Sequence, residues 1–276
     1  MAALSEQTEM IDGEPIFWRS GASPATPPLY IHGVPSNSDD WTEFLKLTGG
    51  FAPDLPGFGR SSKRGDRSYT VEGFDRFIES FCQRHELEQV QLLVHDWGAV
   101  GLSWAQRFPQ KVERLVIINA VPLLPGYHWH RIARAWRTRG LGELLMGSSS
   151  RFVFKQLSRE ANFTPGPLPE HFISSVDDHF DQGTQRSILE LYRTSPETKL
   201  AALGANLGAI ECPALIIWGD HDRYIPSHFA DDYAAALGGP SKVIHLPDAG
   251  HWPWFDRPDV LGEVADFFNG QQQFAT

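Results

Sequence analysis

Short apolar runs in this chain end abruptly in polar or glycine-rich turns, with amphipathic stretches between them. The clearest runs are Val90 to Val94, Arg114 to Asn119, Ala214 to Trp218 and Lys242 to Leu246. Runs of this length are typical of buried strands, and their alternation with helical stretches predicts an α/β fold with a mostly parallel sheet. Because parallel strands end at one edge, the residues that follow them should converge there.

The middle of the chain departs from this rhythm. Two earlier runs, Ile16 to Trp18 and Leu29 to Ile31, add strands, but from Leu123 to Asn206 there is no convincing buried strand, only helical stretches and Gly/Pro-rich loops. We therefore predict a core of residues 1–122 and 207–276, with a helical cap of residues 123–206 inserted over the carboxyl edge of the sheet. Apolar spacing also predicts core helices at 70–87, 99–108 and 260–268.

Charge and composition exclude several kinds of partner. The formal charge is −10, from 34 acidic and 24 basic residues, which argues against nucleic acid and against an anionic membrane. The basic segment Arg131 to Arg139 is the exception, and its spaced charges are typical of a solvated helix face. With two distant cysteines, no signal peptide and no apolar run of membrane length, we expect a cytoplasmic protein.

The run Val90 to Val94 leads into His95-Asp96-Trp97-Gly98 and then a helical stretch. A strand, a sharp turn and a helix place the central residue on an exposed elbow, usually with the pattern G-x-S-x-G. Here Asp96 takes the serine position, Gly98 is kept and Val94 replaces the first glycine. Aspartate also caps helices, so this cluster alone is weak evidence for a nucleophile.

Two further clusters follow the last two predicted strands. Asp220 and Asp222 come after the first of these, and His251 after the second. Each has an ordinary structural explanation, because Asp and Gly form turns and most single histidines are structural. Their order, however, is the nucleophile, acid, histidine order of the hydrolase fold. Near an early strand, His32-Gly33-Val34-Pro35 can direct the N–H of Val34, together with that of Trp97, at a developing oxyanion.

The motifs HGVP, DLPGFGRS, VHDWG, WGDHD and DAGHW together resemble the α/β-hydrolase superfamily over nearly the whole chain except the cap. Asp-Trp-Gly at the elbow resembles two groups within it, epoxide hydrolases and haloalkane dehalogenases. The resemblance implies an eight-stranded sheet flanked by helices. It also implies Asp96 as nucleophile, His251 as base and Asp222 as the orienting acid, because the family acid follows its strand as G-x-x-D.

The leaving group separates the two activities. An opening epoxide needs an O–H donor, and Tyr192 resembles the cap tyrosine of the epoxide hydrolases. Tyr127 is a second donor outside the family pattern. A halide needs N–H donors, which the resemblance assigns to Trp97, with Trp129 or Trp136 as a second.

Two positions give opposite indications. Val34 stands where many dehalogenases carry asparagine, whereas Val94 is more dehalogenase-like than the glycine usual in epoxide hydrolases. We favour an epoxide hydrolase that converts an apolar epoxide to a vicinal diol, with haloalkane dehalogenase as the alternative. A non-catalytic ligand-binding member is disfavoured, because His251 and Asp222 are both retained.

The expected partners are a small apolar electrophile and water. We expect the substrate pocket to include His32, Trp97, Trp129 and Trp252. Phe152, Phe154, Phe163 and Phe172 either line it or pack the cap. Other histidines lack zinc-site spacing, so no metal and no cofactor are expected. The pattern leaves substrate identity and oligomeric state open.

Overall fold

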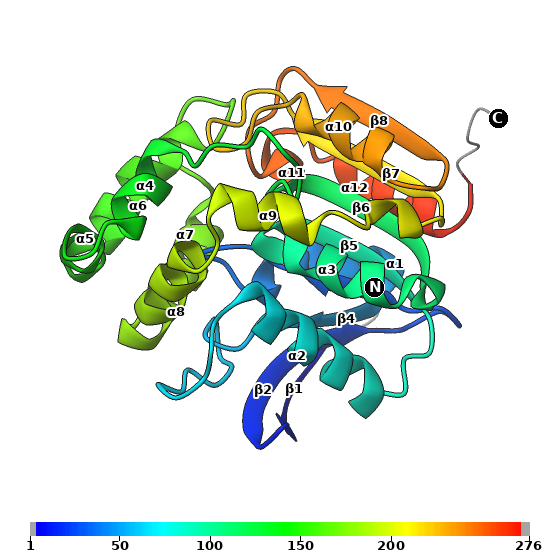
Figure 1. Cartoon of the computed structure of the whole chain (residues 1–276), viewed down its shortest axis with the longest axis horizontal. Helices are drawn as coiled ribbons and strands as arrows, with labels where there is room; N and C mark the ends of the chain where they lie inside the picture. The colour runs from blue at the N-terminus through cyan, green and yellow to red at the C-terminus, as the bar shows by residue number, and fades with distance from the viewer. Residues whose placement is uncertain (1–3, 272–276) are drawn as a thin grey trace.

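The computed structural model describes residues 4–271 and contains a central eight-stranded sheet of order β1-β2-β4-β3-β5-β6-β7-β8 (Figure 1). The β1–β2 and β2–β4 pairs are antiparallel and all other neighbours are parallel, which confirms the predicted sheet. The strands are β1 (Ser5–Ile11), β2 (Glu14–Gly21), β3 (Pro28–Ile31), β4 (Gly50–Pro53), β5 (Val90–Asp96), β6 (Val112–Ala120), β7 (Ala214–Gly219) and β8 (Ser241–Leu246).

The sequence patterns do not predict the edge strand β1. Most of its side chains are exposed and polar, so it contains no apolar run. Asp12 and Gly13 join β1 to β2 with φ values of 52° and 77°, the left-handed conformation that two-residue hairpin turns favour. The Asp-Gly pair is the signal that would have found this hairpin.

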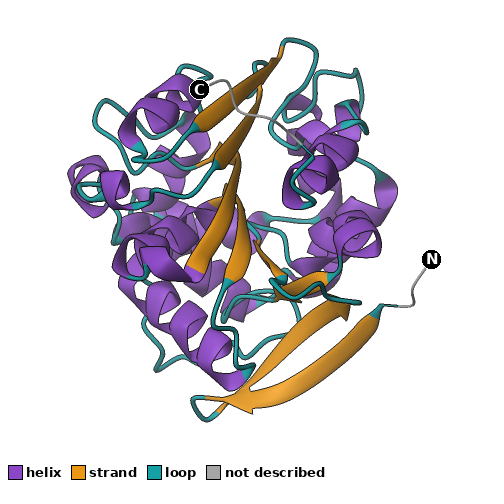
Figure 2. Ribbon diagram, turned by 90° about the vertical axis from the view of Figure 1, so that its right-hand side faces the viewer, coloured by secondary structure: helices purple, strands orange, loops and turns teal. Residues whose placement is uncertain are grey.

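Helices cover both faces of the sheet (Figure 2). Along β5, Leu92 and Val94 face the core formed with α2, α3 and α10, whereas Leu93 faces the core formed with α1, α11 and α12. This alternation follows from the two-residue period of a strand that is buried on both sides. The core helices are α1 (Thr42–Thr48), α2 (Val71–Arg84), α3 (Val100–Arg107), α10 (Phe229–Ala236), α11 (Pro253–Asp256) and α12 (Val260–Phe268).

The chain between β6 and β7 is helical. Figure 1 shows most of it gathered at one side of the sheet, with α9 lying across toward the core. We propose residues 123–206 as the bounds of this cap. Its helices are α4 (Arg131–Arg137), α5 (Leu141–Ser148), α6 (Arg151–Leu157), α7 (Glu170–His179), α8 (Gln182–Arg193) and α9 (Glu197–Leu203). Short 3-10 helices are η1 (Ser38–Trp41), η2 (Trp97–Ala99), η3 (Pro109–Lys111), η4 (Ser158–Glu160) and η5 (Leu207–Ala209).

Candidate active site

Asp96 ends β5 in a strained backbone conformation. Its φ is 49° and its ψ is −122°, a region that non-glycine residues rarely adopt, and η2 and α3 follow at once. Two glycines leave room for this turn. A Cβ at Gly98 would lie 2.1 Å from the carbonyl oxygen of Ile31, and one at Gly33 would lie 2.4 Å from the Cβ of Asp96. The elbow can form only because both positions lack a side chain.

Val94, which replaces the first glycine of the elbow pattern, is accommodated by a glycine on α3. The Val94 side chain is fully buried. A Cβ at Gly101 would lie 3.0 Å from Val94 Cγ1, tighter than ordinary van der Waals contact. In this chain the absence of a side chain at Gly101 therefore makes room for that of Val94.

The Asp96 carboxylate accepts a hydrogen bond from the backbone. The backbone N–H of Val34 donates to Asp96 Oδ2 over 2.7 Å. Burial raises the pKa of Asp96 to about 6, although the charge of His251 and the N–H groups of Val34 and Trp97 act to lower it. An oxygen of an ester formed on Asp96 would meet the same donors.

His251 lies between two carboxylates. Its Nε2 is 3.6 Å from Asp96 Oδ1, and its Nδ1 is 2.6 Å from Asp222 Oδ2. Burial opposes the charged imidazole, but the charge and hydrogen bond of Asp222, together with the charge of Asp96, raise the pKa of His251. Asp220 instead pairs with His245 at 2.7 Å. Of the two aspartates that follow β7, the structure brings Asp222 to the histidine.

Asn119 and the loop after β7 hold Asp222 in place. Asn119 Nδ2 donates to Asp222 Oδ2 over 2.8 Å, and the backbone N–H groups of Tyr224 and Ile225 donate to Asp222 Oδ1 over 2.7 and 3.0 Å. Asn119 has a φ of 38°, in the left-handed region. Sequence reasoning missed its role, although its place at the end of β6 put it at the expected edge.

The backbone of His251 is fixed from two sides. His95 Nε2 donates to the His251 carbonyl oxygen over 2.8 Å. The His251 N–H donates over 2.8 Å to the carbonyl oxygen of Ala161, which follows η4 in the cap. The position of the histidine therefore depends on the cap as well as on the core.

A cavity of about 140 Å³ lies over Asp96 and His251. Its wall is mainly apolar and comes from both core and cap. Tyr127, Trp129, Tyr192 and Trp252 of the predicted set line it, as does Phe154. His130 and Tyr224 also line it, and the sequence did not indicate them. Within the described chain, no three His, Cys, Asp or Glu side chains gather as a metal site.

Two residues predicted for the pocket wall lie elsewhere. His32 is fully buried, accepts from the Leu55 N–H at Nε2 over 2.8 Å, and donates from Nδ1 to the Gly33 carbonyl over 2.8 Å. It joins two loops and does not face the cavity. Trp97 packs against the wall residues Trp129 and Tyr192, with ring centroids 5.4 and 5.1 Å away, and is not itself part of the wall.

Two of the four predicted phenylalanines lie at or beside the cavity, and two are exposed. Phe172 is buried against Trp252, and Phe154 stacks on Phe172. Phe152 and Phe163 are exposed.

The proposed leaving-group donors differ in their availability. The Trp129 indole N–H donates to the carbonyl oxygen of Ser195 over 3.0 Å and is thereby occupied. The Trp97 indole N–H is buried, makes no hydrogen bond of ordinary geometry among the described residues, and lies near the Tyr192 hydroxyl, whose pKa it acts to lower. Burial and the charge of Asp96 raise the pKa of Tyr192 well above its usual value, so its hydroxyl keeps its proton. The Tyr127 hydroxyl makes only a long contact, 3.5 Å, with the Tyr224 carbonyl.

Comparison with known proteins shows which family has this architecture. A profile described as the Alpha/beta hydrolase family matches residues 29–264. A haloalkane dehalogenase of Mesorhizobium japonicum is 27% identical, over 95% of this chain and 90% of the relative. The crystal structure of the haloalkane dehalogenase DbeA from Bradyrhizobium elkani USDA94 has a TM-score of 0.84 and 26% identity, covering 97% of this chain and 98% of that one. The epoxide hydrolase CorEH, at 18% identity, has the same fold, with a TM-score of 0.84 over 98% of this chain and all of that one (100%).

The chain thus belongs to the α/β-hydrolase family and is a hydrolase of that fold. Within the family it is similar to the branch that holds haloalkane dehalogenases and epoxide hydrolases, as the motifs at Asp96, Asp222 and His251 indicate.

Proposed function

We propose that this protein hydrolyses a small apolar epoxide through an alkyl ester on Asp96. The observation that carries the proposal is the line of three buried groups, with His251 Nε2 3.6 Å from Asp96 and His251 Nδ1 2.6 Å from Asp222. A histidine oriented by one carboxylate and turned toward a second is suited to hydrolysing an ester formed on the second.

In the first step, an Asp96 oxygen attacks a ring carbon of the epoxide. The carbon–oxygen bond of the ring breaks, and the ring oxygen takes the hydroxyl proton of Tyr192. With a pKa of about 6, Asp96 is mostly ionised at neutral pH and needs no separate base. This differs from a serine at the same elbow, which must lose a proton to attack.

In the second step, His251 accepts a proton from water, whose oxygen attacks the carboxyl carbon of Asp96. The negative charge that develops on the ester oxygen faces the N–H groups of Val34 and Trp97. Collapse breaks the bond between the carboxyl carbon and the alkyl oxygen. The alkyl oxygen leaves with the proton that His251 took up, which releases the diol. The second proton of the attacking water passes from the Asp96 carboxyl to the Tyr192 phenolate, so the carboxylate and the hydroxyl are both restored.

The available donors favour an epoxide over a halide. A halide needs two N–H groups, but Val34 has no donor in its side chain and the N–H of Trp129 is occupied by Ser195. Tyr192, by contrast, lines the cavity, and its hydroxyl stays protonated. The cavity volume of about 140 Å³ suits a substrate of about the size of benzene.

Haloalkane dehalogenation is the second candidate. It is favoured by the buried indole N–H of Trp97 and by the dehalogenases among the similar proteins. Trp136 lines the cavity next to Tyr192, with ring centroids 5.2 Å apart, and would have to supply the second N–H.

The deciding experiment uses His251→Phe, which should allow the first step and block the second. The variant is incubated with styrene oxide or with 1-bromobutane, and the adduct is located by intact mass and peptide mapping. An adduct on Asp96 with the full mass of the epoxide supports epoxide hydrolysis. An alkyl adduct without bromine, and none from the epoxide, supports dehalogenation.

The doubly substituted chain Asp96→Ala/His251→Phe is the matched control and should form no adduct. If neither compound labels Asp96 and the wild type turns over neither class, the proposal of an aspartate nucleophile fails. The protein would then be better described as a ligand-binding member of the fold.

A further inference from the structure

The cap carries an unusual exposed apolar surface, which we call the α5–α6 face. Along α5, Leu141, Leu144 and Leu145 fall on one stripe because they are spaced i, i+3, i+4. On α6 no residue is buried, and Leu144 and Phe152 are 69% and 70% exposed. The face comprises Leu141, Leu144, Leu145, Phe152, Val153 and Leu157, all of them exposed.

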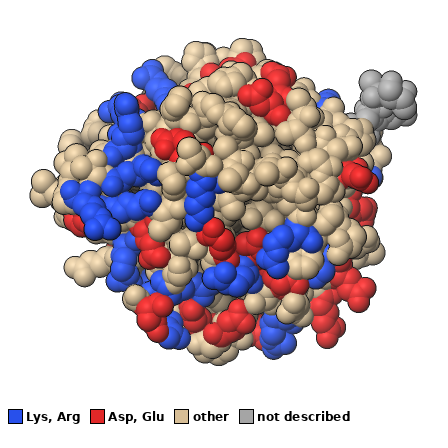
Figure 3. Space-filling model, viewed as in Figure 1, with Lys and Arg blue, Asp and Glu red and all other residues tan. Residues whose placement is uncertain are grey.

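The same part of the chain is strongly basic. Residues 131–159 hold seven Arg or Lys and one acidic residue, Glu143, a net charge of +6 in a chain whose total is −10. In Figure 3 blue atoms gather at the end of the molecule where Figure 1 draws α4, α5 and α6. The molecule therefore has one cationic region, although the net charge of the whole chain is negative.

Four of these cations form ion pairs with acidic residues outside the segment, and three form none with the residues that the structure describes. Arg131 pairs with Glu160, Arg137 with Glu197, and Arg151 and Lys155 both with Glu170, while Arg151 also lies 3.5 Å from Asp177. Arg134, Arg139 and Arg159 are exposed and have no ion pair among residues 4–271. These three can meet an anionic surface without first breaking an internal contact.

The cavity above Asp96 opens at this face. Of the residues that line it, only Ser150, Val153, Leu157 and Asp177 are exposed. Val153 and Leu157 belong to the α5–α6 face itself. An apolar molecule leaving a surface seated on this face would enter the cavity directly.

We propose that the α5–α6 face docks on an anionic lipid bilayer. Exposed apolar side chains surrounded by Arg and Lys are the pattern of helices that lie in a membrane interface. The described chain contains no helix long and apolar enough to span one. A second copy of this chain would bring two sets of arginines that are unpaired in the described structure, Arg134, Arg139 and Arg159, together in a symmetric contact, so charge disfavours it. The proposal departs from the expectation of no membrane partner, which was drawn from the total charge, because the charges are segregated along the chain.

The test measures co-sedimentation of the full chain with vesicles. One set contains phosphatidylcholine with 30% phosphatidylglycerol and the other phosphatidylcholine alone. We expect binding to the first set, at least tenfold weaker binding to the second, and release by 0.5 M NaCl. Arg134→Glu/Arg139→Glu/Arg159→Glu and, separately, Leu144→Gln/Phe152→Gln should each weaken binding at least tenfold.

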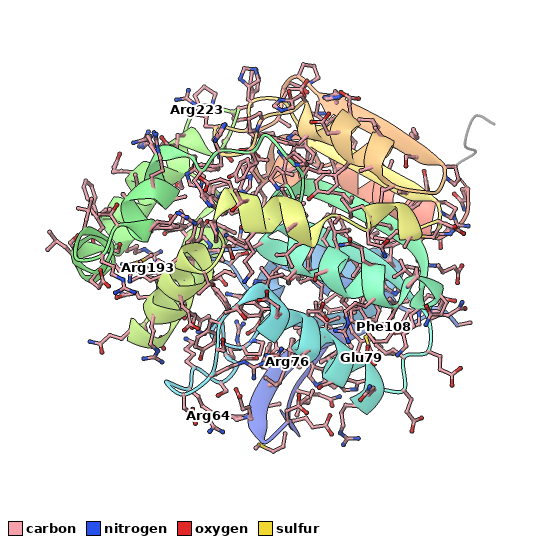
Figure 4. All side chains as sticks on the ribbon, in the orientation of Figure 1. Arg64, Arg76, Glu79, Phe108, Arg193 and Arg223 are labelled. Atoms are coloured by element: carbon pink, nitrogen blue, oxygen red, sulfur yellow. The ribbon has the colours of Figure 1, made fainter. Side chains whose placement is uncertain are left out.

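Matched controls lie on other parts of the surface. Arg64→Glu/Arg76→Glu/Arg84→Glu changes the same number of charges near α2, where Figure 4 labels Arg64 and Arg76. Two of these arginines are ion-paired, Arg64 with Asp66 and Arg84 with Glu9, so this triple controls for the change in charge alone. Leu47→Gln removes an apolar group that is 58% exposed on α1. Both controls should bind anionic vesicles as the wild type does, and all variants should keep the wild-type unfolding temperature.

Three outcomes would overturn the proposal. These are no binding to either vesicle, equal loss of binding in the control triple, and a dimer in sedimentation velocity that Leu144→Gln/Phe152→Gln dissociates. The last would assign the face to a second copy. Docking is independent of the proposed reaction, because hydrolysis of a water-soluble epoxide without vesicles should be unchanged in every face variant.

Discussion

The backbone N–H of His251 donates a hydrogen bond to the carbonyl oxygen of Ala161 over 2.8 Å, which ties the histidine loop directly to the cap. The preceding residue makes this approach possible. A Cβ at Gly250 would lie only 2.1 Å from the same carbonyl oxygen. The distance from His251 to Asp96 therefore depends on how closely the cap backbone approaches Gly250.

Gly250→Ala should separate the histidine loop from the cap. We expect kcat to fall at least tenfold and the free energy of unfolding to fall by about 1–3 kcal/mol, the usual effect of overpacking. Steady-state kinetics and thermal unfolding measure the two effects. Gly262→Ala is the control, because a Cβ there meets nothing within 4 Å and the position is in the exposed part of α12. Wild-type kcat in Gly250→Ala would show that this contact does not position the base.

Tyr192→Phe should distinguish the two kinds of substrate. Without the hydroxyl, an opening epoxide loses its proton donor, and we expect kcat/KM to fall by at least a factor of about 100. Cleavage of a bromoalkane needs no such proton and should change by less than about threefold. Diol and bromide release are measured with the same preparation. A drop that is equal for both substrates would mean that Tyr192 only packs the cavity.

The first half-reaction should depend on pH through Asp96. Attack requires the carboxylate, and burial raises its pKa to about 6, so the rate of ester formation should fall as pH drops through that value. In His251→Phe the cation that lowers this pKa is gone, and the fall should begin at higher pH. Stopped-flow tryptophan fluorescence reports the step through Trp97 and Trp129, which stack 5.4 Å apart. Superimposable profiles for the two proteins would contradict the coupling.

Asp96→Asn should stabilise the protein at high pH. The pKa of Asp96 is about 6 in the folded chain and about 3.9 in an unfolded one, so above pH 6 folding buries a charge that an amide lacks. The free energy of unfolding should rise by about 1–3 kcal/mol at pH 8. At pH 4 only about half of the unfolded chains carry this charge, so the difference should shrink to about 0.5 kcal/mol or less.

Urea unfolding at the two pH values measures the effect. Asp178→Asn on α7, which is exposed, is the control and should change the free energy by less than about 0.5 kcal/mol at either pH. A gain in stability that is the same at pH 8 and pH 4 would mean that removal of the buried charge is not its cause.

Sequence patterns predicted the sheet because its central strands are buried on both faces and so form continuous apolar runs. The same runs located Asp96, Asp222 and His251, since each follows a strand that ends at the shared edge. The strand β1 was not predicted, because an exposed edge strand needs no apolar residues.

Contacts between distant segments could not be predicted in this way. His32 was expected in the pocket because it follows a strand. Its ring instead accepts a hydrogen bond from the backbone N–H of Leu55, which is 23 residues away in the sequence. The bond from Trp129 to Ser195, which removes one halide donor, depends on how α4 and α9 approach each other. No local pattern encodes that distance.

The contact between Val94 and Gly101 bears on how members of this family are recognised. A search that demands glycine two residues before the nucleophile would overlook this chain, although its elbow is intact. In this chain the room for the Val94 side chain comes from Gly101, the facing position seven residues later. A chain with bulk at both positions should be unable to close the turn, and a chain with glycine at both should leave a void behind it. Positions 94 and 101 are therefore best considered together when a sequence is searched for this elbow.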